Sequence, residues 1–277
     1  PPHYHCNYGR ISHDELRKTA EARIQSASRN PPPYPRPIVQ PYTVADDFYP
    51  NSHRYKLVEL DGVEKKEWLP SPSSVTNKLD KSAGLMKWAV NTFETTMLDH
   101  MRDGVNFTKD DVIAMMNISK MAYNERKQEA ADVGTIVHEY AENGKIDSEK
   151  MEMLSDDDQK KALDGVDAFK EWLTVMEPNI KDTEFRVFSR RHKYVGTCDG
   201  LAEIDGKTYI IDYKTSKGIY TSHLYQVAAY MKAYEEMTGE RVDGAKIINF
   251  TKADVYDKAG ELVRAAGTFY SHTITRG

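Results

Sequence analysis

Cysteine is scarce in this sequence. Cys6 and Cys198 are the only two among 277 residues, and they lie far apart. So low a number excludes a small scaffold held together by disulfides. No run of about 18 or more apolar residues occurs, which argues against a membrane-spanning helix. The 16 glycines and 12 prolines are too few for a collagen-like or low-complexity chain.

An excess of positive charge is also missing. The chain has 38 lysines and arginines against 43 aspartates and glutamates, a formal net charge of −5. This balance argues against a broad basic coat for nucleic acid, although it leaves room for a local basic groove. Since one domain usually takes about 100–200 residues, the length predicts one large domain, with or without an arm.

The first 41 residues are predicted to be an arm. Ser12 and Glu15 fit a capping box that opens a short helix to about Ser28, with a thin apolar stripe. Five prolines within residues 31–37 then favour an extended connector. We expect the arm to be a tether, and the alternative is a docking element for a protein partner or for self-association. Residues 42–277 are predicted to form a single domain.

The pattern up to residue 177 is mainly helical. Asp61-Gly62 between two short extended runs, 55–60 and 63–69, predicts a β-hairpin. Apolar residues at helical spacing then predict a helical part of the domain, about residues 73–177. Its helices are expected from Ser73 or Ser74 to about 79, then over 84–100, 109–131, 134–142 and 157–176. The methionine stripes, such as Met115, Met116 and Met121, are expected to be core, because methionine fills irregular gaps.

From residue 184 to 251 the period changes to two. Strands are predicted over 184–189, 194–204 and 207–213, followed by a helix over 219–237 and a strand over 243–251. The first two turns are short, so the first three strands should run antiparallel, and the helix should bring the fourth back into a mixed sheet. The fold class is therefore predicted to be α/β, with a mixed central sheet flanked by helices.

One group of side chains in this sheet suggests chemistry. Asp212 and Lys214 are two residues apart on one strand, so they share a face, and Tyr213 points the other way. Counting back across the Asp205-Gly206 turn places Asp199 about opposite Asp212, where Cβ atoms lie about 4.5–5.5 Å apart. Two carboxylates that close repel each other unless a cation lies between them.

The same group predicts a site for a hard metal ion. Oxygen ligands suit Mg²⁺ or Mn²⁺, and a lysine beside the metal can orient a water or offset the charge of a phosphate. These are the parts needed to hydrolyse a phosphodiester bond. The plainer alternative is that Asp212 and Lys214 form an ordinary surface ion pair, which is the usual reading of an isolated Asp-X-Lys.

Four motifs occur in a fixed order: Gly134-X-X-X-His138, Gly196-X-X-Asp199, Asp212-X-Lys214 and Gln226-X-X-X-Tyr230. In this order the chain resembles the PD-(D/E)XK nuclease superfamily, specifically its RecB-like exonuclease branch, which also includes Cas4-type and mitochondrial genome maintenance exonucleases. The resemblance spans about residues 73–251. It implies the restriction-endonuclease-like fold, with an αβββαβ core and a catalytic sheet over about 184–251.

The resemblance also implies roles for single residues. Asp199, Asp212, His138 and the backbone carbonyl of Tyr213 would ligate the metal, and Lys214 would position the attacking water. Gln226 and Tyr230 share one helical face that would position DNA or catalytic residues. Glu184 resembles a glutamate that such proteins often carry on the first strand of the sheet. Glu142 is a weaker candidate for the site, since it could simply hydrogen-bond His138. Cys198 stands where the superfamily's name has proline, and four cysteines for an iron–sulfur cluster are lacking.

DNA, as single strands or free duplex ends, is the partner that the resemblance implies. Basic residues near the hairpin turn and on the preceding helical region are candidates for phosphate contacts, although they could equally be ordinary solvated charges: Arg186, Arg190, Arg191, Lys193, Arg126 and Lys127.

We therefore expect a metal-dependent DNA exonuclease of recombination, repair or replication. By association with stand-alone RecB-like nucleases, we expect it in the cytoplasm of a prokaryotic or virus-infected cell. The alternatives are an endonuclease of the same fold and a binding module that does not cleave.

Overall fold

The computed structural model describes residues 42–49, 54–61, 63–77 and 82–275. The predicted arm over residues 1–41, with its helix and proline-rich connector, lies outside these residues. The domain boundary at residue 42 therefore stays a prediction. Among the described helices, none combines the length and the hydrophobicity that crossing a lipid bilayer needs.

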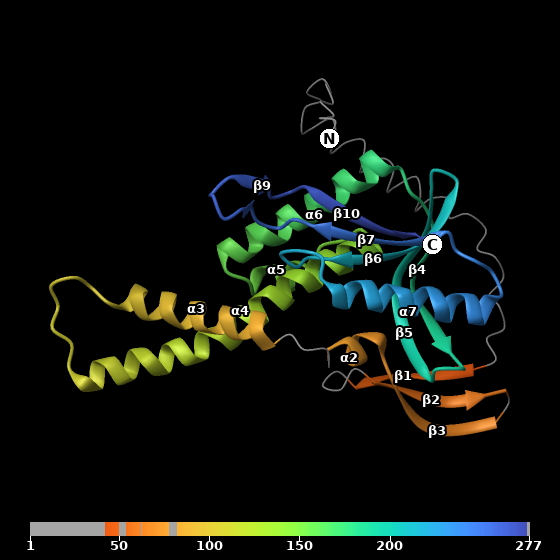
Figure 1. Cartoon of the computed structure of the whole chain (residues 1–277), viewed down its shortest axis with the longest axis horizontal. Coiled ribbons are helices and arrows are strands. Elements are labelled where there is room, and N and C mark those ends of the chain that lie inside the picture. The colour runs from red at the N-terminus through yellow and green to blue at the C-terminus, as the bar shows by residue number, and fades with distance from the viewer. Residues whose placement is uncertain (1–41, 50–53, 62, 78–81, 276–277) are drawn as a thin grey trace.

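A five-stranded mixed sheet forms the centre of the molecule (Figure 1). Its strands lie in the order β10-β7-β6-β5-β4, and all neighbours are antiparallel except β6 and β7, which are parallel. The strands are β4 (Asn179–Ser189), β5 (Tyr194–Ile204), β6 (Lys207–Lys214), β7 (Gly244–Phe250) and β10 (Phe269–Thr275). The predicted mixed sheet is confirmed; β10 was not predicted.

Short turns and one crossover helix give the sheet its order. Asp205 and Gly206 join β5 to β6 with φ angles of 52° and 72°. Two left-handed residues in a row match the twist of the strands, which is why Asp-Gly marks this hairpin in the sequence. The helix α7 (Thr221–Thr238) then carries the chain from β6 to the parallel β7. Together with α6 (Asp156–Met176), these elements make the predicted αβββαβ order.

Helices cover both faces of the sheet. On one face α6 and the C-terminal half of α4 (Lys109–Asn143) pack against Tyr213 and its neighbours. The rings of Phe169 and Trp172 meet Tyr213 with centroids 5.8 and 5.6 Å apart. On the other face, α7 packs against Ile210 and the side chains around it. Successive residues of β6 therefore enter opposite cores, as the period of two predicted.

The region from Lys109 to Asn143 corrects the prediction of two helices, since it is one helix of 35 residues. Thr108 and Asp111 form a capping box at its start, and Gly144, with φ 70°, ends it. The prediction began a second helix at Gly134, and glycine within a helix costs about 1 kcal/mol relative to alanine. Here the helix needs it: a Cβ at this position would lie 2.9 Å from Thr215 Oγ1, after β6.

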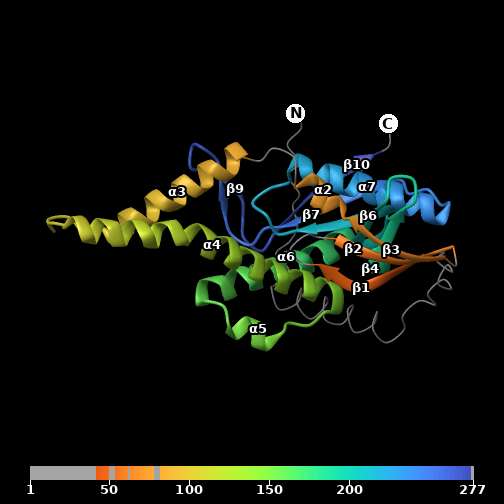
Figure 2. The same ribbon diagram turned by 90° about the horizontal axis from the view of Figure 1, so that it is seen from below.

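The N-terminal half of α4 forms a hairpin with α3 (Ser82–His100) that projects beyond the sheet (Figures 1 and 2). The prediction that the methionine stripes are core is wrong for most of them. Met115 is buried, but Met116 is 36% and Met121 is 62% exposed. Two helices that project together cover only one side of each other, so the remaining apolar side chains face outward.

A second sheet holds β1 (Tyr42–Tyr49), β2 (Arg54–Leu60) and β3 (Val63–Pro70), so the hairpin predicted around Asp61 is confirmed. A hydrogen bond of 2.9 Å between the hydroxyls of Tyr55 and Thr197 ties this sheet to β5. Ser71 caps the following helix, in place of the predicted Ser73 or Ser74. The remaining elements are α2 (Pro72–Thr76), α5 (Ser148–Glu152), β8 (Val255–Tyr256) and β9 (Leu262–Arg264).

Candidate active site

Three acidic residues lie at the same level of three neighbouring strands. The ladder between β5 and β6 runs from Ile204–Lys207 to Gly200–Ile211, so Asp199 and Asp212 are the next residues on each strand. Glu184 lies between the paired residues Thr183–Gly200 and Phe185–Cys198 of β4 and β5, and therefore opposite Asp199. The carboxylates of β5 and β6 are thus brought to one end of the same ladder.

Asp212 is the most deeply buried charged group of this cluster, with a side chain that is 1% exposed. Its Oδ2 lies 2.6 Å from Lys214 Nζ. Burial raises the pKa of Asp212 to about 6, although the nearby Lys214 opposes the rise. Burial also acts to lower the pKa of Lys214, but Asp212 and Asp199 outweigh it, and the net shift is upward. The lysine is therefore held in its charged form by the two carboxylates.

Asp199 links the strand ends to helix α4. Its Oδ2 accepts a hydrogen bond of 2.6 Å from the backbone N–H of Tyr213 and lies 4.0 Å from His138 Nδ1. Burial and the charge of Lys214 lower the pKa of His138 to about 4, so the imidazole is neutral near pH 7. A neutral imidazole keeps the lone pair that a metal ligand needs.

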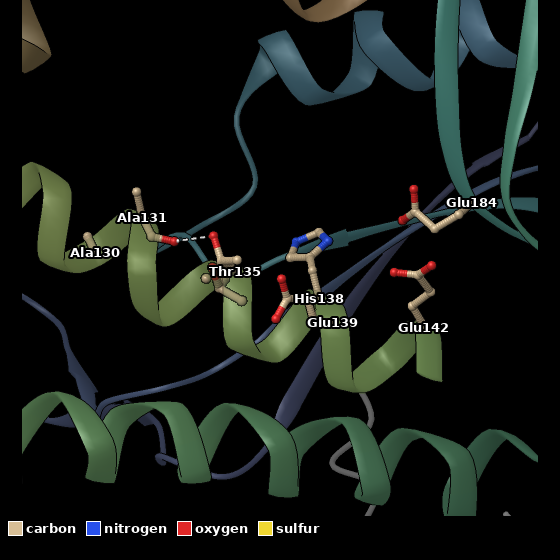
Figure 3. A pocket seen from close by; sticks show the side chains of 9 residues that line it. Ala130, Ala131, Thr135, His138, Glu139, Glu142 and Glu184 are labelled. Atoms are coloured by element: carbon tan, nitrogen blue, oxygen red, sulfur yellow. Dashed lines mark hydrogen bonds between the residues drawn. The ribbon is translucent and has the colours of Figure 1, made fainter. Parts of the chain in front are cut away.

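An open depression of about 490 Å³ lies beside this cluster, between α4 and the sheet. His138, Glu142, Glu184 and Thr215 are among the residues that line it. Figure 3 shows His138 and Glu142 on the same helix, with the Glu184 carboxylate across from them. Burial, Asp199 and Glu142 together raise the pKa of Glu184 to about 7. Its backbone is left-handed, with φ 49°, which is uncommon for a non-glycine residue within a strand.

The Gln226–Tyr230 pair lies on α7, on the other side of the sheet from α4. Gln226 Nε2 donates a hydrogen bond of 2.8 Å to Tyr230 Oη, and the tyrosine is 4% exposed. Tyr230 is therefore not an ordinary surface residue of the helix. A Cβ at Gly196 would lie 2.4 Å from Tyr230 Cε1, so the glycine of one motif makes room for the tyrosine of another.

A model of the PD-(D/E)XK nuclease superfamily matches residues 114–268, more than half of the chain. This chain belongs to the PD-(D/E)XK nuclease superfamily. The matched region runs from the N-terminal half of α4 to the residue before β10 and includes all four sequence motifs. A search of curated proteins found no match. Membership of this nuclease superfamily indicates a metal-dependent phosphodiester hydrolase with a nucleic-acid substrate.

The side chains at the strand ends suit the divalent ions, such as Mg²⁺ and Mn²⁺, that PD-(D/E)XK nucleases typically use. Asp212 Oδ1 is buried without a hydrogen-bond partner among the described residues. Leaving a buried carboxylate oxygen unpaired is costly, and a cation would remove that cost. Two buried carboxylates also face a single ammonium, which leaves net negative charge. Oxygen ligands with an imidazole are a donor set that Mg²⁺ or Mn²⁺ accepts.

The ligand set is not gathered in one place. In the part of the chain that the structure describes, no three His, Cys, Asp or Glu side chains lie close enough together to hold an ion. Lys214 Nζ lies beside Asp212 and also donates a hydrogen bond of 3.2 Å to the Tyr213 carbonyl oxygen. The ammonium thus neutralises the groups that a metal would contact.

The basic residues predicted to contact DNA differ in their surroundings. Arg190 makes a two-pronged ion pair with Asp61, and Lys193 Nζ lies 3.8 Å from Glu67. Both therefore face acids of the second sheet. Arg186 lies over the ring of Tyr55, 5.9 Å from its centroid, and Arg191 is exposed.

Two other basic residues, Arg126 and Lys127, are exposed on α4, about one turn before the Ala130 that lines the depression.

Thr215 was missed by reasoning from the sequence. It lines the depression and contacts the helix at Gly134, and the only signal in the sequence was its place directly after Lys214.

Cys198 is fully buried, in keeping with the expectation of a small apolar core residue. Burial raises the pKa of its thiol, which keeps it protonated and unreactive.

Proposed function

We propose that this nuclease is an exonuclease of the RecB-like branch that degrades DNA from free ends, using Mg²⁺ or Mn²⁺. The observation that carries the proposal is the convergence of Asp199, Asp212 and Lys214 at one end of the β5–β6 ladder, next to an open depression. The order of the four motifs supports the choice of branch.

Each residue has a role that its surroundings support. Asp199, Asp212, the neutral His138 and the Tyr213 carbonyl would hold the metal. A bound divalent ion supplies charge that activates water and stabilises a crowded phosphate in the transition state. Lys214 would leave its ion pair with Asp212 to orient the attacking water or to offset charge on the scissile phosphate. Glu184 and Glu142 face the same depression and would complete its polar lining.

The substrate would lie along the depression between α4 and the sheet. Arg126 and Lys127 on α4 are placed to meet phosphates there, and Arg186 and Arg191 are further candidates on the hairpin. The ion pairs of Arg190 and Lys193 with acids of the second sheet make these two weaker candidates for phosphate contacts. Since the overall charge is −5, binding would depend on this local set of basic residues.

The test is digestion of end-labelled single-stranded and duplex DNA with Mg²⁺, Mn²⁺ or a chelator. We expect cleavage with either metal and none with chelator. Asp212→Asn and Lys214→Ala should each lower the rate by about 100-fold or more. Matched controls are Asp205→Asn, in the turn of the same hairpin, and Lys207→Ala, on the same strand; both should cleave as the wild type does.

Covalently closed circular DNA distinguishes the alternatives. An exonuclease leaves it intact, so linearised circles would show an endonuclease instead. Cleavage that survives chelation, or that is unchanged in both site variants, would refute the proposed mechanism. A protein that binds DNA and takes up Mn²⁺ in isothermal titration, but cleaves none of these substrates, would refute the activity while leaving the metal site in place.

A further inference from the structure

Most of the larger apolar side chains of the α3–α4 hairpin face outward, although Met115 is buried and the rings of Trp88 and Tyr123 meet. Small residues lie where the two helices meet: Thr92, Thr96, Ser119 and Ala122 are buried there. The hydroxyls of Thr96 and Ser119 donate to carbonyls one turn earlier in their own helices, at 2.8 and 2.9 Å. These side chains are small, and the hydroxyls of Thr96 and Ser119 are hydrogen-bonded within their own helices, so the two helices can approach closely. Most of the bulky apolar residues therefore lie on other sides of the helices.

Many of these bulky residues line up along one side. On α3 and just past its end, Met86, Val90, Phe93, Met97 and Met101 follow each other at spacings of three or four residues. Their exposed fractions reach 66% at Met86, 49% at Val90 and 40% at Met101. This spacing keeps side chains on one face of a helix, so they form a continuous apolar stripe.

The N-terminal half of α4 has a matching row. Ile113, Met116, Lys120 and Tyr123 follow at spacings of three, four and three residues, and Ile113 and Met116 are 44% and 36% exposed. We call the two rows together the outer stripe. It belongs to the hairpin that projects beyond the sheet (Figures 1 and 2), and five of its apolar side chains are exposed: Met86, Val90, Met101, Ile113 and Met116.

We propose that the outer stripe is an interface through which two copies of this chain associate, with α3 of one copy against α4 of the other. A row of this kind on both helices makes the surface complementary to itself, as the interface of a two-fold dimer requires. Burying exposed methionine, valine and isoleucine side chains supplies the driving force.

The size of the face is close to what a dimer needs. The 19 residues of α3 span about 28 Å. Two helices packed about 8–10 Å apart are about 20 Å wide. The face is therefore on the order of 550 Å² before side-chain relief is added. A standard interface buries about 800 Å² on each partner, so the hairpin face offers about two-thirds of that area, which suits a reversible dimer.

Charge selects the pairing of α3 with α4. The rings of Trp88 and Tyr123 lie 4.9 Å apart, which places these residues level with each other in the antiparallel hairpin. With Trp88 level with Tyr123, Glu94 is level with about residue 117 of α4. Lys120 lies three residues further along α4, which is roughly 4.5 Å along the helix axis. Glu94 lies beside the outer stripe, and Lys120 lies within it. Pairing α3 with α4 of a second copy brings these opposite charges together. Pairing α3 with α3 would instead bring Glu94 near Glu94 of the second copy, and these like charges repel.

The test is sedimentation velocity of the full-length protein without DNA, over a range of micromolar concentrations. We expect a monomer–dimer equilibrium. Met86→Glu should raise the dimer dissociation constant by about 30-fold or more, since it places a carboxylate on the most exposed apolar side chain of the outer stripe. Met86 is mostly exposed, so the substitution leaves the fold of the monomer unchanged, which circular dichroism can verify.

Met121→Glu is the matched control. Met121 is the same residue type with a similar exposed fraction, 62%, but it lies at least about 80° round α4 from the outer stripe. It should leave the dimer intact. A wild type that is monomeric at every concentration would overturn the proposal, as would a dimer that Met121→Glu weakens and Met86→Glu does not.

A charge exchange tests the arrangement within the dimer. Glu94→Lys and Lys120→Glu should each weaken association, and the double variant should restore it. If the neutral substitution Glu94→Gln strengthens the dimer and Lys120→Glu leaves it unchanged, α3 faces α3, and the proposed pairing is wrong. None of these variants touches the catalytic cluster, so cleavage and association can fail independently.

Discussion

Gly196 and Tyr230 make the sharpest prediction, because two motifs meet in one contact. An alanine Cβ at position 196 would lie 2.4 Å from Tyr230 Cε1 and 3.1 Å from Pro72 Cδ. Carbon atoms pack at about 3.5–4.0 Å, so the ring would have to withdraw by about 1 Å. It has little room, since Tyr230 is 4% exposed and packed in the core beneath α7.

We expect Gly196→Ala to destabilise the protein by about 1–2 kcal/mol. Overpacking of this kind costs about 1–3 kcal/mol. Removing a glycine from a strand returns about 0.5–1 kcal/mol, because alanine loses less backbone entropy on folding. With a urea dependence of about 2 kcal/mol per molar, the unfolding midpoint should fall by roughly 0.5–1 M.

A double-mutant cycle identifies the cause. Tyr230→Leu removes the ring, so Gly196→Ala should cost nothing further in that background, a coupling of about 1–2 kcal/mol. Tyr230→Phe keeps Cε1 and should give no relief. A Gly196→Ala protein as stable as the wild type, or a Tyr230→Phe background that rescues as well as Tyr230→Leu, would show that this contact does not explain the glycine.

Three further outcomes follow from buried and exposed charges. Lys214→Met should lower the free energy of unfolding, measured without metal at pH 8, by about 3 kcal/mol, because it leaves buried carboxylates without their cation; an unchanged urea midpoint would contradict this. Burial raises the pKa of Glu171 in the folded protein, although the Phe269 N–H opposes it. The folded state then binds more protons, so stability falls as pH rises above the ordinary glutamate pKa. Glu171→Gln should remove that fall between pH 4 and pH 8, and an equal pH slope in both proteins would count against it. Arg190→Ala breaks only an exposed pair, so its midpoint should match the wild type within error, whereas a clear loss would mean that the pair stabilises the hairpin.

Much of the fold could be predicted from the sequence because its signals are local. The Asp205-Gly206 turn needs two left-handed residues, and the sequence supplies residues that adopt that conformation. The alternation along β6 placed Tyr213 in one core and Ile210 in the other. The strand β10 was missed, because it pairs with β7 only through contacts distant in sequence.

The errors at the helices have a common cause. A helix was predicted to begin at Gly134, but this glycine lies inside one helix and faces Thr215, 81 positions later in the chain. Met116 and Met121 suggested core, because helical spacing predicts an apolar face and cannot say what covers it.

For the candidate site, counting across a turn predicted which residues would meet, since register is local. The ion pair of Asp212 with Lys214 was one of the alternatives, but the sequence could not show that this pair would be buried and not on the surface. The roles of all these residues remain predictions.

The single long helix α4 connects two parts of the molecule that would otherwise be independent. About 22 residues, or roughly 33 Å of unbroken helix, separate Met116 from His138. Over that length, a shift of nearly 2 Å at the tip tilts the helix by only about 3° at the imidazole. Because Val133, Ile136 and Val137 hold the base of this rod in the core, His138 and the projecting hairpin belong to one rigid element that is anchored at the sheet.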